Sequence, residues 1–137
     1  MDFSEKYIKM CAEAEEIQRE LFCGHYDDYV YIECGEKDIM FSGVFIFDFC
    51  KKFRNIQKIV MLPRQDQLQQ MLSPFYVDEN GKVDWREMYE DLFYHLPILI
   101  EIDTPEQAWL HLVMKVKYNK IWDDKKEKWV EMEGRDD

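Results

Sequence analysis

Apolar residues recur at steps of three and four over residues 2–22, which predicts an amphipathic helix. The stripe consists of Tyr7, Met10, Ala14, Ile17 and Leu21, and Glu13, Glu16 and Glu20 lie on the opposite face. Asp2 and Glu5 have the spacing of a capping box at the start of this helix. Only about three heptads fit into this length, which is short for a coiled coil, so we expect the helix to pack on a sheet.

The period changes to that of β-structure between residues 26 and 62. Runs rich in β-branched and aromatic residues occupy residues 29–34, 39–41, 44–49 and 58–62. A turn is expected at residues 35–38 and a basic turn at residues 51–55. Because the connections are short, the pattern predicts an antiparallel meander.

Two helices are expected in the middle of the chain. Pro63 favours the start of a short helix over residues 64–72. A second helix is predicted over residues 84–96, where Asp84 and Glu87 have capping-box spacing and Pro97 ends the pattern. Its apolar positions are Trp85, Met88, Tyr89, Leu92, Phe93 and Leu96. This spacing predicts a full apolar stripe facing the core.

The clearest local pattern lies at residues 104–130. Thr104 suits an N-cap, Pro105 the first helical position and Gln107 the third. Apolar residues occupy two sides of the helix that follows, and Asn119 suits a left-handed C-cap. Residues 121–123 and 129–132 then flank a charged turn and predict a hairpin. We interpret this region as scaffold.

These elements predict an α+β fold, with one small antiparallel sheet of about four to six strands packed by three main helices. A chain of 137 residues fits a single domain, residues 1–137, with residues 134–137 as a disordered tail. The chain contains neither an apolar run long enough to span a membrane nor an apolar signal core after Met1. We therefore expect a cytoplasmic protein without a membrane partner.

Charge is distributed unevenly along the chain, whose net charge is −11. Residues 78–106 hold nine acids and two bases. Direct nucleic-acid binding is not expected from such a region, because it requires clustered Lys and Arg. The excess of acids favours a partner protein with a basic surface. The candidate partner-binding acids are Asp84, Glu87, Glu90, Asp91, Glu101 and Asp103.

A second candidate surface is the polar segment Arg64, Gln65 and Asp66. The side-chain amide of Gln65 offers both donors and acceptors to a partner. The same residues are equally those expected at the start of a helix, with a local Arg–Asp pair.

Residues that carry catalysis or hold a cofactor are not evident. The cysteines, Cys11, Cys23, Cys34 and Cys50, lack close paired spacing and read as buried apolar residues. The histidines, His25, His95 and His111, lack the spacing of a metal site on a helix. We therefore predict a non-enzymatic protein without metal, cofactor or catalytic residues.

Two alternatives stay open. Glu101, Asp103, Asp124 and Lys126 are acids and a lysine of the kind found in metal-dependent nucleases and hydrolases. Asp124 and Lys126 are more simply interpreted as the tip of a solvated hairpin. The other alternative is a structural subunit that self-associates as a homo-oligomer through its Tyr- and Phe-rich sheet.

Several strings resemble a group of uncharacterised small proteins from phages and prophages of Firmicutes-type bacteria. They are residues 7–11 with 14–18, residues 62–69 (Leu-Pro-Arg-Gln-Asp-Gln-Leu-Gln), residues 105–110 and residues 117–123. The resemblance implies a phage or prophage setting in a bacterial host cytoplasm, but it assigns no role to any residue. Small acidic phage proteins are often inhibitors of host systems. The leading hypothesis is accordingly an acidic protein-binding module, for example an inhibitor that occupies a basic nucleic-acid-binding surface of a host protein.

Overall fold

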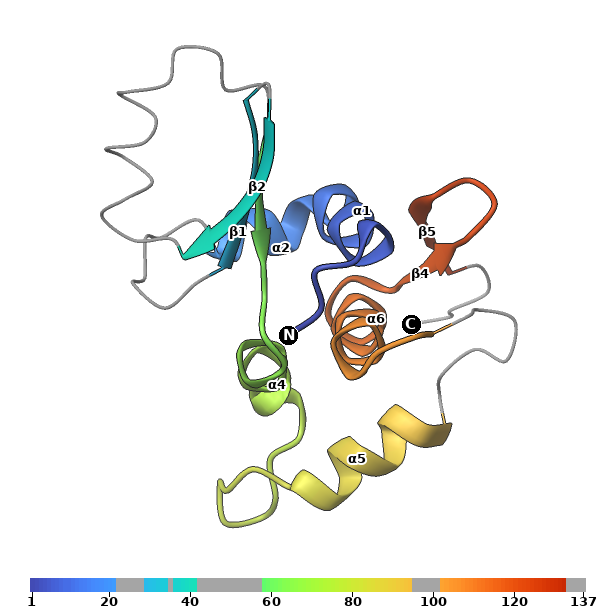
Figure 1. Cartoon of the computed structure of the whole chain (residues 1–137). Coiled ribbons are helices and arrows are strands. Elements are labelled where there is room, and N and C mark those ends of the chain that lie inside the picture. Colours follow the sequence, from blue (N-terminus) through green and yellow to red (C-terminus); the bar gives the residue numbers. More distant parts are fainter. Residues whose placement is uncertain (22–28, 35, 42–57, 95–101, 133–137) are drawn as a thin grey trace. The chain divides into compact units, whose positions relative to one another are not determined.

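The computed structural model describes residues 1–21, 29–34, 36–41, 58–94 and 102–132 (Figure 1). Contacts divide the chain into two compact units. One unit is Phe3–Arg64, and the other combines Met1–Asp2 with Gln65–Asp137. The single domain expected from the length stays a prediction, and the expected tail at residues 134–137 lies outside the described residues.

The unit Phe3–Arg64 contains a three-stranded antiparallel sheet in the order β2-β1-β3 (Figure 1). Its strands are β1 (Tyr29–Cys34), β2 (Glu36–Phe41) and β3 (Lys58–Leu62). In the central strand, Val30 is opposite Met40 on one side and Met61 on the other. The strands predicted at residues 29–34 and 58–62 are confirmed, whereas β2 begins within the predicted turn. The strand predicted at residues 44–49 lies outside the described residues.

The helix predicted over residues 2–22 is instead two helices, α1 (Glu5–Glu13) and α2 (Glu15–Leu21). The break is at Ala14, whose ψ of 71° is not helical. The N-cap is Ser4, whose hydroxyl accepts a hydrogen bond from the backbone N–H of Tyr7 at 3.2 Å. The predicted capping role of Asp2 is therefore wrong, because the helix begins two residues later than its spacing with Glu5 suggested.

Both helices turn their apolar stripe inward, as the periodicity predicted. Tyr7, Met10, Cys11 and Ile17 are all fully buried. The hydroxyl of Tyr7 donates a 2.6 Å hydrogen bond to the backbone carbonyl of Pro63, so the buried phenol is satisfied beside the end of β3. Cys11 is fully buried, as expected of a small core residue.

The other unit is built around α6 (Pro105–Tyr118). Figure 1 shows α4, α5 and the β4–β5 hairpin arranged around this helix. Their bounds are α4 (Gln65–Leu72), α5 (Trp85–Tyr94), β4 (Lys120–Asp123) and β5 (Lys128–Glu131), with a 3-10 turn η1 (Ser73–Phe75) after α4. All residues from Gln107 to Met114 are buried. The prediction of a helix covered on two sides is therefore confirmed.

Both predicted caps of α6 are confirmed. The Thr104 hydroxyl accepts a hydrogen bond from the Gln107 backbone N–H at 3.3 Å, and the Gln107 side chain accepts one from the Asp103 backbone N–H at 3.2 Å. Asn119 has φ 56° and ψ 41°, the left-handed conformation of a C-cap. The hairpin begins at the next residue, Lys120. The end of the helix therefore sets the start of the hairpin.

The α+β class is confirmed, but the arrangement differs from the predicted one. Strands in the described ranges form one sheet of three and one of two rather than a single sheet of about four to six. The reason is that β4 follows α6 directly and pairs with β5. The described ranges also hold five α-helices rather than three main ones, because the first divides in two and α4 is a full helix. None of the described helices has the length and apolarity needed to cross a membrane.

Candidate functional site

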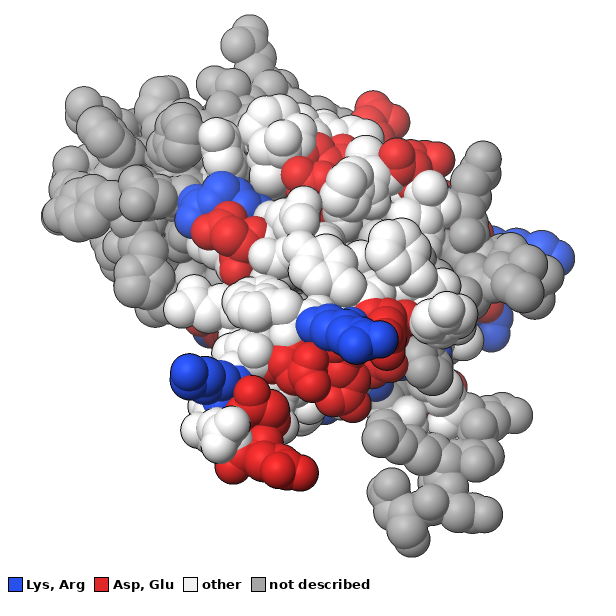
Figure 2. Space-filling model, turned by 90° about the horizontal axis from the view of Figure 1, so that it is seen from below, with Lys and Arg blue, Asp and Glu red and all other residues white. Residues whose placement is uncertain are grey.

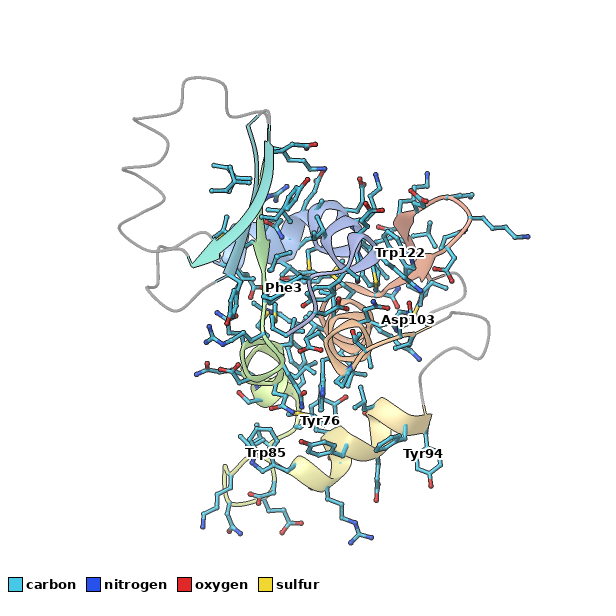
Figure 3. All side chains as sticks on the ribbon, in the orientation of Figure 1. Phe3, Tyr76, Trp85, Tyr94, Asp103 and Trp122 are labelled. Carbon is cyan, nitrogen blue, oxygen red and sulfur yellow. The ribbon has the colours of Figure 1, made fainter. Side chains whose placement is uncertain are left out.

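The most unusual surface of the described residues is the outward face of α5. Four aromatic side chains of this helix are exposed, with exposed fractions of 48% for Trp85, 41% for Tyr89, 75% for Phe93 and 82% for Tyr94. Figure 3 shows Trp85 and Tyr94 at opposite ends of the helix, with Tyr94 projecting away from it. An exposed group of large apolar side chains is typical of an interaction site.

These side chains form two neighbouring rows along the helix. Residues four apart lie one above the other on a helix surface. One row is therefore Trp85, Tyr89 and Phe93, and the adjacent row is Arg86, Glu90 and Tyr94. The first row spans about 12 Å at the helical rise of about 1.5 Å per residue. We call the residues of these two rows the aromatic face.

The predicted apolar stripe of this helix is only partly buried. Met88 is 0% exposed and Leu92 is 7% exposed, so these two residues face the core. The predicted burial of Trp85, Tyr89 and Phe93 is wrong, because only the narrower Met88–Leu92 edge of the helix is buried. Leu96 lies outside the described residues.

Tyr89 connects the aromatic face to the core. Its ring contacts that of Trp109 edge-on, with centroids 5.2 Å apart. Its hydroxyl oxygen accepts a hydrogen bond from the side-chain amide of Gln69 in α4 at 3.2 Å. Since Trp109 is buried, the middle of the aromatic face is held in place while its two ends are more exposed.

The acids predicted to form the binding edge of α5 have different environments. Asp84 caps the helix, because its carboxylate accepts a hydrogen bond from the Glu87 backbone N–H at 3.1 Å. Asp91 is half-buried and accepts a 2.7 Å hydrogen bond from the hydroxyl of Tyr76. These two carboxylates are therefore engaged within the fold. Glu87 and Glu90 are exposed and can meet a partner directly.

The Tyr76–Asp91 contact affects the titration of its neighbours. Burial raises the pKa of the Tyr76 hydroxyl, and the hydrogen bond and charge of Asp91 raise it further. Burial lowers the pKa of Lys115 in α6, and the charge of Asp91 partly offsets this. Tyr76 therefore stays a neutral donor of the hydrogen bond to Asp91.

The surroundings of the aromatic face are acidic overall. Residues 73–94 contain six acids and two bases. Figure 2, seen from the α5 side, shows carboxylates gathered with fewer basic groups beside uncharged surface. Phe75 and Val77, which precede α5 in the chain, are also about half exposed (51% and 49%).

The remaining predicted acids lie near the start of α6 or outside the described part. Asp103 is exposed next to the N-cap, and Figure 3 shows it at the beginning of α6. Glu101 is outside the described residues. The structure therefore brings Asp84, Glu87, Glu90 and Asp91 together on one helix, and the joining of Glu101 and Asp103 to them stays a prediction.

The polar segment Arg64, Gln65 and Asp66 spans the point in the sequence where one unit ends and the other continues. Arg64 is the last residue of one unit, and Gln65 and Asp66 open α4 in the other. Arg64 and Gln65 are half-buried and Asp66 is exposed. The interpretation as a helix start is confirmed by α4, whereas a recognition role for this segment stays a prediction.

The residues of the hydrolase alternative have structural contacts. Asp124 accepts a 3.0 Å hydrogen bond from the indole N–H of Trp122. In the adjacent turn, Asp123 accepts hydrogen bonds from the backbone N–H groups of Lys125 and Lys126 at 2.9 and 3.1 Å. The hydrogen bond from the Lys126 backbone N–H is the largest cause of the lowered pKa of Asp123. Within the described ranges, no group of three or more His, Cys, Asp or Glu side chains is placed to hold a metal ion.

His111 is a buried titratable residue that the sequence did not single out. It is fully buried in α6, and its ring centroid lies 5.7 Å from that of Trp129 in β5. Among the described residues, neither ring nitrogen has a hydrogen-bond partner. Burial and the charge of Lys115 lower the pKa of His111 from 6.5 to about 4, against the opposing effect of Asp124. The sequence gave no signal of this burial or of the lowered pKa, because His111 is a single histidine without a second metal-ligand residue nearby.

The aromatic face is thus an exposed group of large apolar side chains with an ion pair, carried by one helix of an α+β fold. Comparison of the chain with family models, with curated proteins and with solved structures finds no match in any of the three.

Proposed function

We propose that the chain is a non-enzymatic protein-binding module that binds a basic partner protein through the aromatic face of α5. The observation that carries the proposal is the exposure of Trp85, Phe93 and Tyr94 on a well-formed helix bearing the exposed carboxylates Glu87 and Glu90. Large aromatic residues supply most of the energy at many protein interfaces. Carboxylates around them steer a basic partner and fix its orientation.

The charge of this surface supports a basic protein over other occupants. Residues 73–94 carry an excess of four acids over bases. Such a segment repels the phosphates of nucleic acid, whose binding depends on Lys and Arg. It also repels a second copy of itself, because two acidic surfaces would be brought together. A partner with clustered Lys or Arg is attracted by these acids and suffers neither of these repulsions.

A protein with this partner preference suits the proposed role of an inhibitor of phage or prophage type. Host proteins with strongly basic surfaces commonly use them for nucleic acid. Carboxylates that occupy such a surface compete with phosphates for the same cations. The role is supported by the acidic composition and by the resemblance of the strings at residues 7–18, 62–69 and 105–123.

The proposal is tested by titrating a synthetic amphipathic peptide, with Arg on one face and Leu on the other, into the full chain. We expect binding that weakens steeply with salt, because the carboxylates attract the peptide over distances that salt screens. Combined Glu87→Lys and Glu90→Lys substitutions should weaken it at least about tenfold. Asp91 is left unchanged, since it accepts the Tyr76 hydrogen bond.

The matched control combines Glu5→Lys and Glu15→Lys, which change the net charge equally on exposed positions of α1 and α2. This control should reduce affinity far less. Equal losses in both variants, or an affinity independent of salt, would contradict the proposal. Loss of binding with Phe93→Ser, at unchanged charge, would separate the aromatic contribution from the electrostatic one.

A further inference from the structure

The pair formed by Arg86 and Glu90 lies in the middle of the aromatic face. The Nε of Arg86 is 3.2 Å from Oε1 of Glu90, and the two residues are one helical turn apart. Both side chains are well exposed, at 89% and 52%. An exposed ion pair at this spacing contributes little to the stability of the helix, so a partner can displace it at low cost.

The surroundings of Glu90 suit a guanidinium group. Phe93 and Tyr94 follow Glu90 by three and four residues on the helix and are the two most exposed aromatic residues of α5. A guanidinium is planar, stacks on aromatic rings and binds a carboxylate through two parallel hydrogen bonds. The compact, strongly hydrated ammonium of a lysine gains less from this combination.

We infer that the aromatic face selects an arginine-bearing segment of its partner, and that Arg86 holds the place of the partner's guanidinium on Glu90 in the free protein. The inference rests on the proposed function and adds the chemistry of the partner. Arg86 then acts as a built-in competitor. It shields Glu90 until an arginine of the partner, supported by apolar contacts with the aromatic rows, replaces it.

The test compares the Arg peptide with a twin in which every Arg is Lys, using the full chain and the variant Arg86→Gln. The wild-type chain should bind the Arg peptide several-fold more tightly than its Lys twin. Arg86→Gln should strengthen binding of the Arg peptide about two- to fivefold, because Glu90 no longer has an internal partner. Chemical shifts of the Trp85 indole N–H report whether the peptide occupies this face.

The matched control is Arg19→Gln. Arg19 also pairs with an acid one helical turn away, Glu15, at 3.7 Å, and both side chains are exposed. This variant changes the net charge equally but lies on α2. An equal gain in both variants would show an effect of net charge alone and overturn the role of Arg86. Weaker binding by Arg86→Gln would also overturn it, because Arg86 would then be a direct contact.

Other outcomes separate this inference from the proposed function. The Arg and Lys peptides could bind with equal affinity while the Glu87→Lys, Glu90→Lys variant still binds more weakly. This result would overturn arginine selection but leave the proposal of a basic partner standing. Absence of any effect in that double variant would overturn both. Concentration-dependent self-association that Phe93→Ser abolishes would identify a second copy of the chain as the occupant and contradict the inference.

Discussion

The side-chain amide of Gln18 lies against Met61 as the backbone of a further β-strand would. Its oxygen accepts a 2.7 Å hydrogen bond from the Met61 N–H, and its nitrogen donates a 2.9 Å hydrogen bond to the Met61 carbonyl. The same nitrogen donates to the Cys11 carbonyl at 2.9 Å, beside the break between α1 and α2. One side chain therefore satisfies backbone groups of both β3 and the interrupted helix.

Replacing Gln18 should leave these backbone groups without partners. We expect Gln18→Leu to lower the free energy of unfolding by about 2–3 kcal/mol, because unsatisfied buried polar groups each cost about 1–3 kcal/mol. Urea denaturation followed by circular dichroism measures this change. Gln18→Glu, which places a carboxylate oxygen against the Cys11 and Met61 carbonyls in place of the donor, should cost at least as much as Gln18→Leu. A loss below about 0.5 kcal/mol for Gln18→Leu would show that solvent replaces the amide.

Asp2 should stabilise the start of α6, although it is about a hundred residues away in the chain. Its carboxylate accepts hydrogen bonds from the Thr104 hydroxyl at 2.5 Å and the Gln107 side-chain amide at 2.9 Å. Asp2→Ala should lower the free energy of unfolding by about 1–3 kcal/mol, as expected for hydrogen bonds to a charged group. Thr104→Ala should cost about 1–2 kcal/mol as a lost cap.

The two losses should not add, because both substitutions remove the same hydrogen bond. A double-mutant cycle measured by denaturation checks this coupling. Additive losses would mean that Asp2 and Thr104 act independently.

His111 should make the protein less stable as the solution becomes acidic. Its pKa is lowered to about 4 in the fold, so the unfolded chain, with a pKa near 6.5, takes up the proton more readily. The stability is complete above about pH 6.5 and falls as the pH drops towards 4, by about 3 kcal/mol in all. His111→Leu should flatten this part of the curve, because it removes the titrating imidazole.

The measurement is the free energy of unfolding at intervals between pH 7 and pH 4. Histidines elsewhere in the chain titrate in both proteins and cancel in the difference. An identical pH dependence of the wild-type chain and His111→Leu would show that protonation at this position is accommodated.

Glu127 offers a stabilising substitution. Its φ of 51° lies in the left-handed region, which costs a residue with a side chain about 1 kcal/mol or more. Glu127→Gly should raise the free energy of unfolding by up to about 1 kcal/mol, measured as a shift in Tm. Asn119→Gly, at φ 56°, should gain less, because Asn tolerates this conformation. A destabilised Glu127→Gly would show that its side chain makes contacts that outweigh the strain.

Trp109 should be essential for the stability of the α6 unit. It is 1% exposed and its ring contacts Tyr89. Trp109→Ala should lower the free energy of unfolding by about 3–5 kcal/mol and abolish peptide binding through unfolding, as circular dichroism will show. A folded Trp109→Ala protein that fails to bind would instead mean that Trp109 orients Tyr89 for the partner.

Local rules predicted well those elements whose signals come from neighbouring residues. The caps of α6 at Thr104 and Asn119 and the hairpin that follows depend on a few adjacent side chains, and both were predictable. The break at Ala14 was not, because it involves neither Gly nor Pro. It is accompanied by a hydrogen bond from the Gln18 side chain, which also reaches a distant strand. Likewise, the spacing of Asp2 and Glu5 suggested a cap, whereas Asp2 bonds to Thr104.

The candidate site was predictable in part. The composition located the acids on α5 but could not show that Asp84 and Asp91 are engaged within the fold. Periodicity showed which residues share a side of the helix, but it does not give the width of the surface against which they pack. Burial of Met88 and Leu92 alone leaves Trp85 and Phe93 exposed. The apolar stripe of α5 is wider than the surface against which the helix packs. This excess width is the signal that would have indicated the aromatic face.

The unequal burial of α5 and α6 implies a hierarchy of local opening. Backbone amides of α6 lie in a helix with eight successive buried residues, so their exchange with deuterium should require nearly global unfolding. The α5 helix buries only Met88 and Leu92, and Tyr89 and Asp91 add individual contacts, so its amides should exchange by local detachment. A ligand on its outer face would then slow exchange in α5 while leaving that in α6 unchanged, so protection factors would map the bound surface.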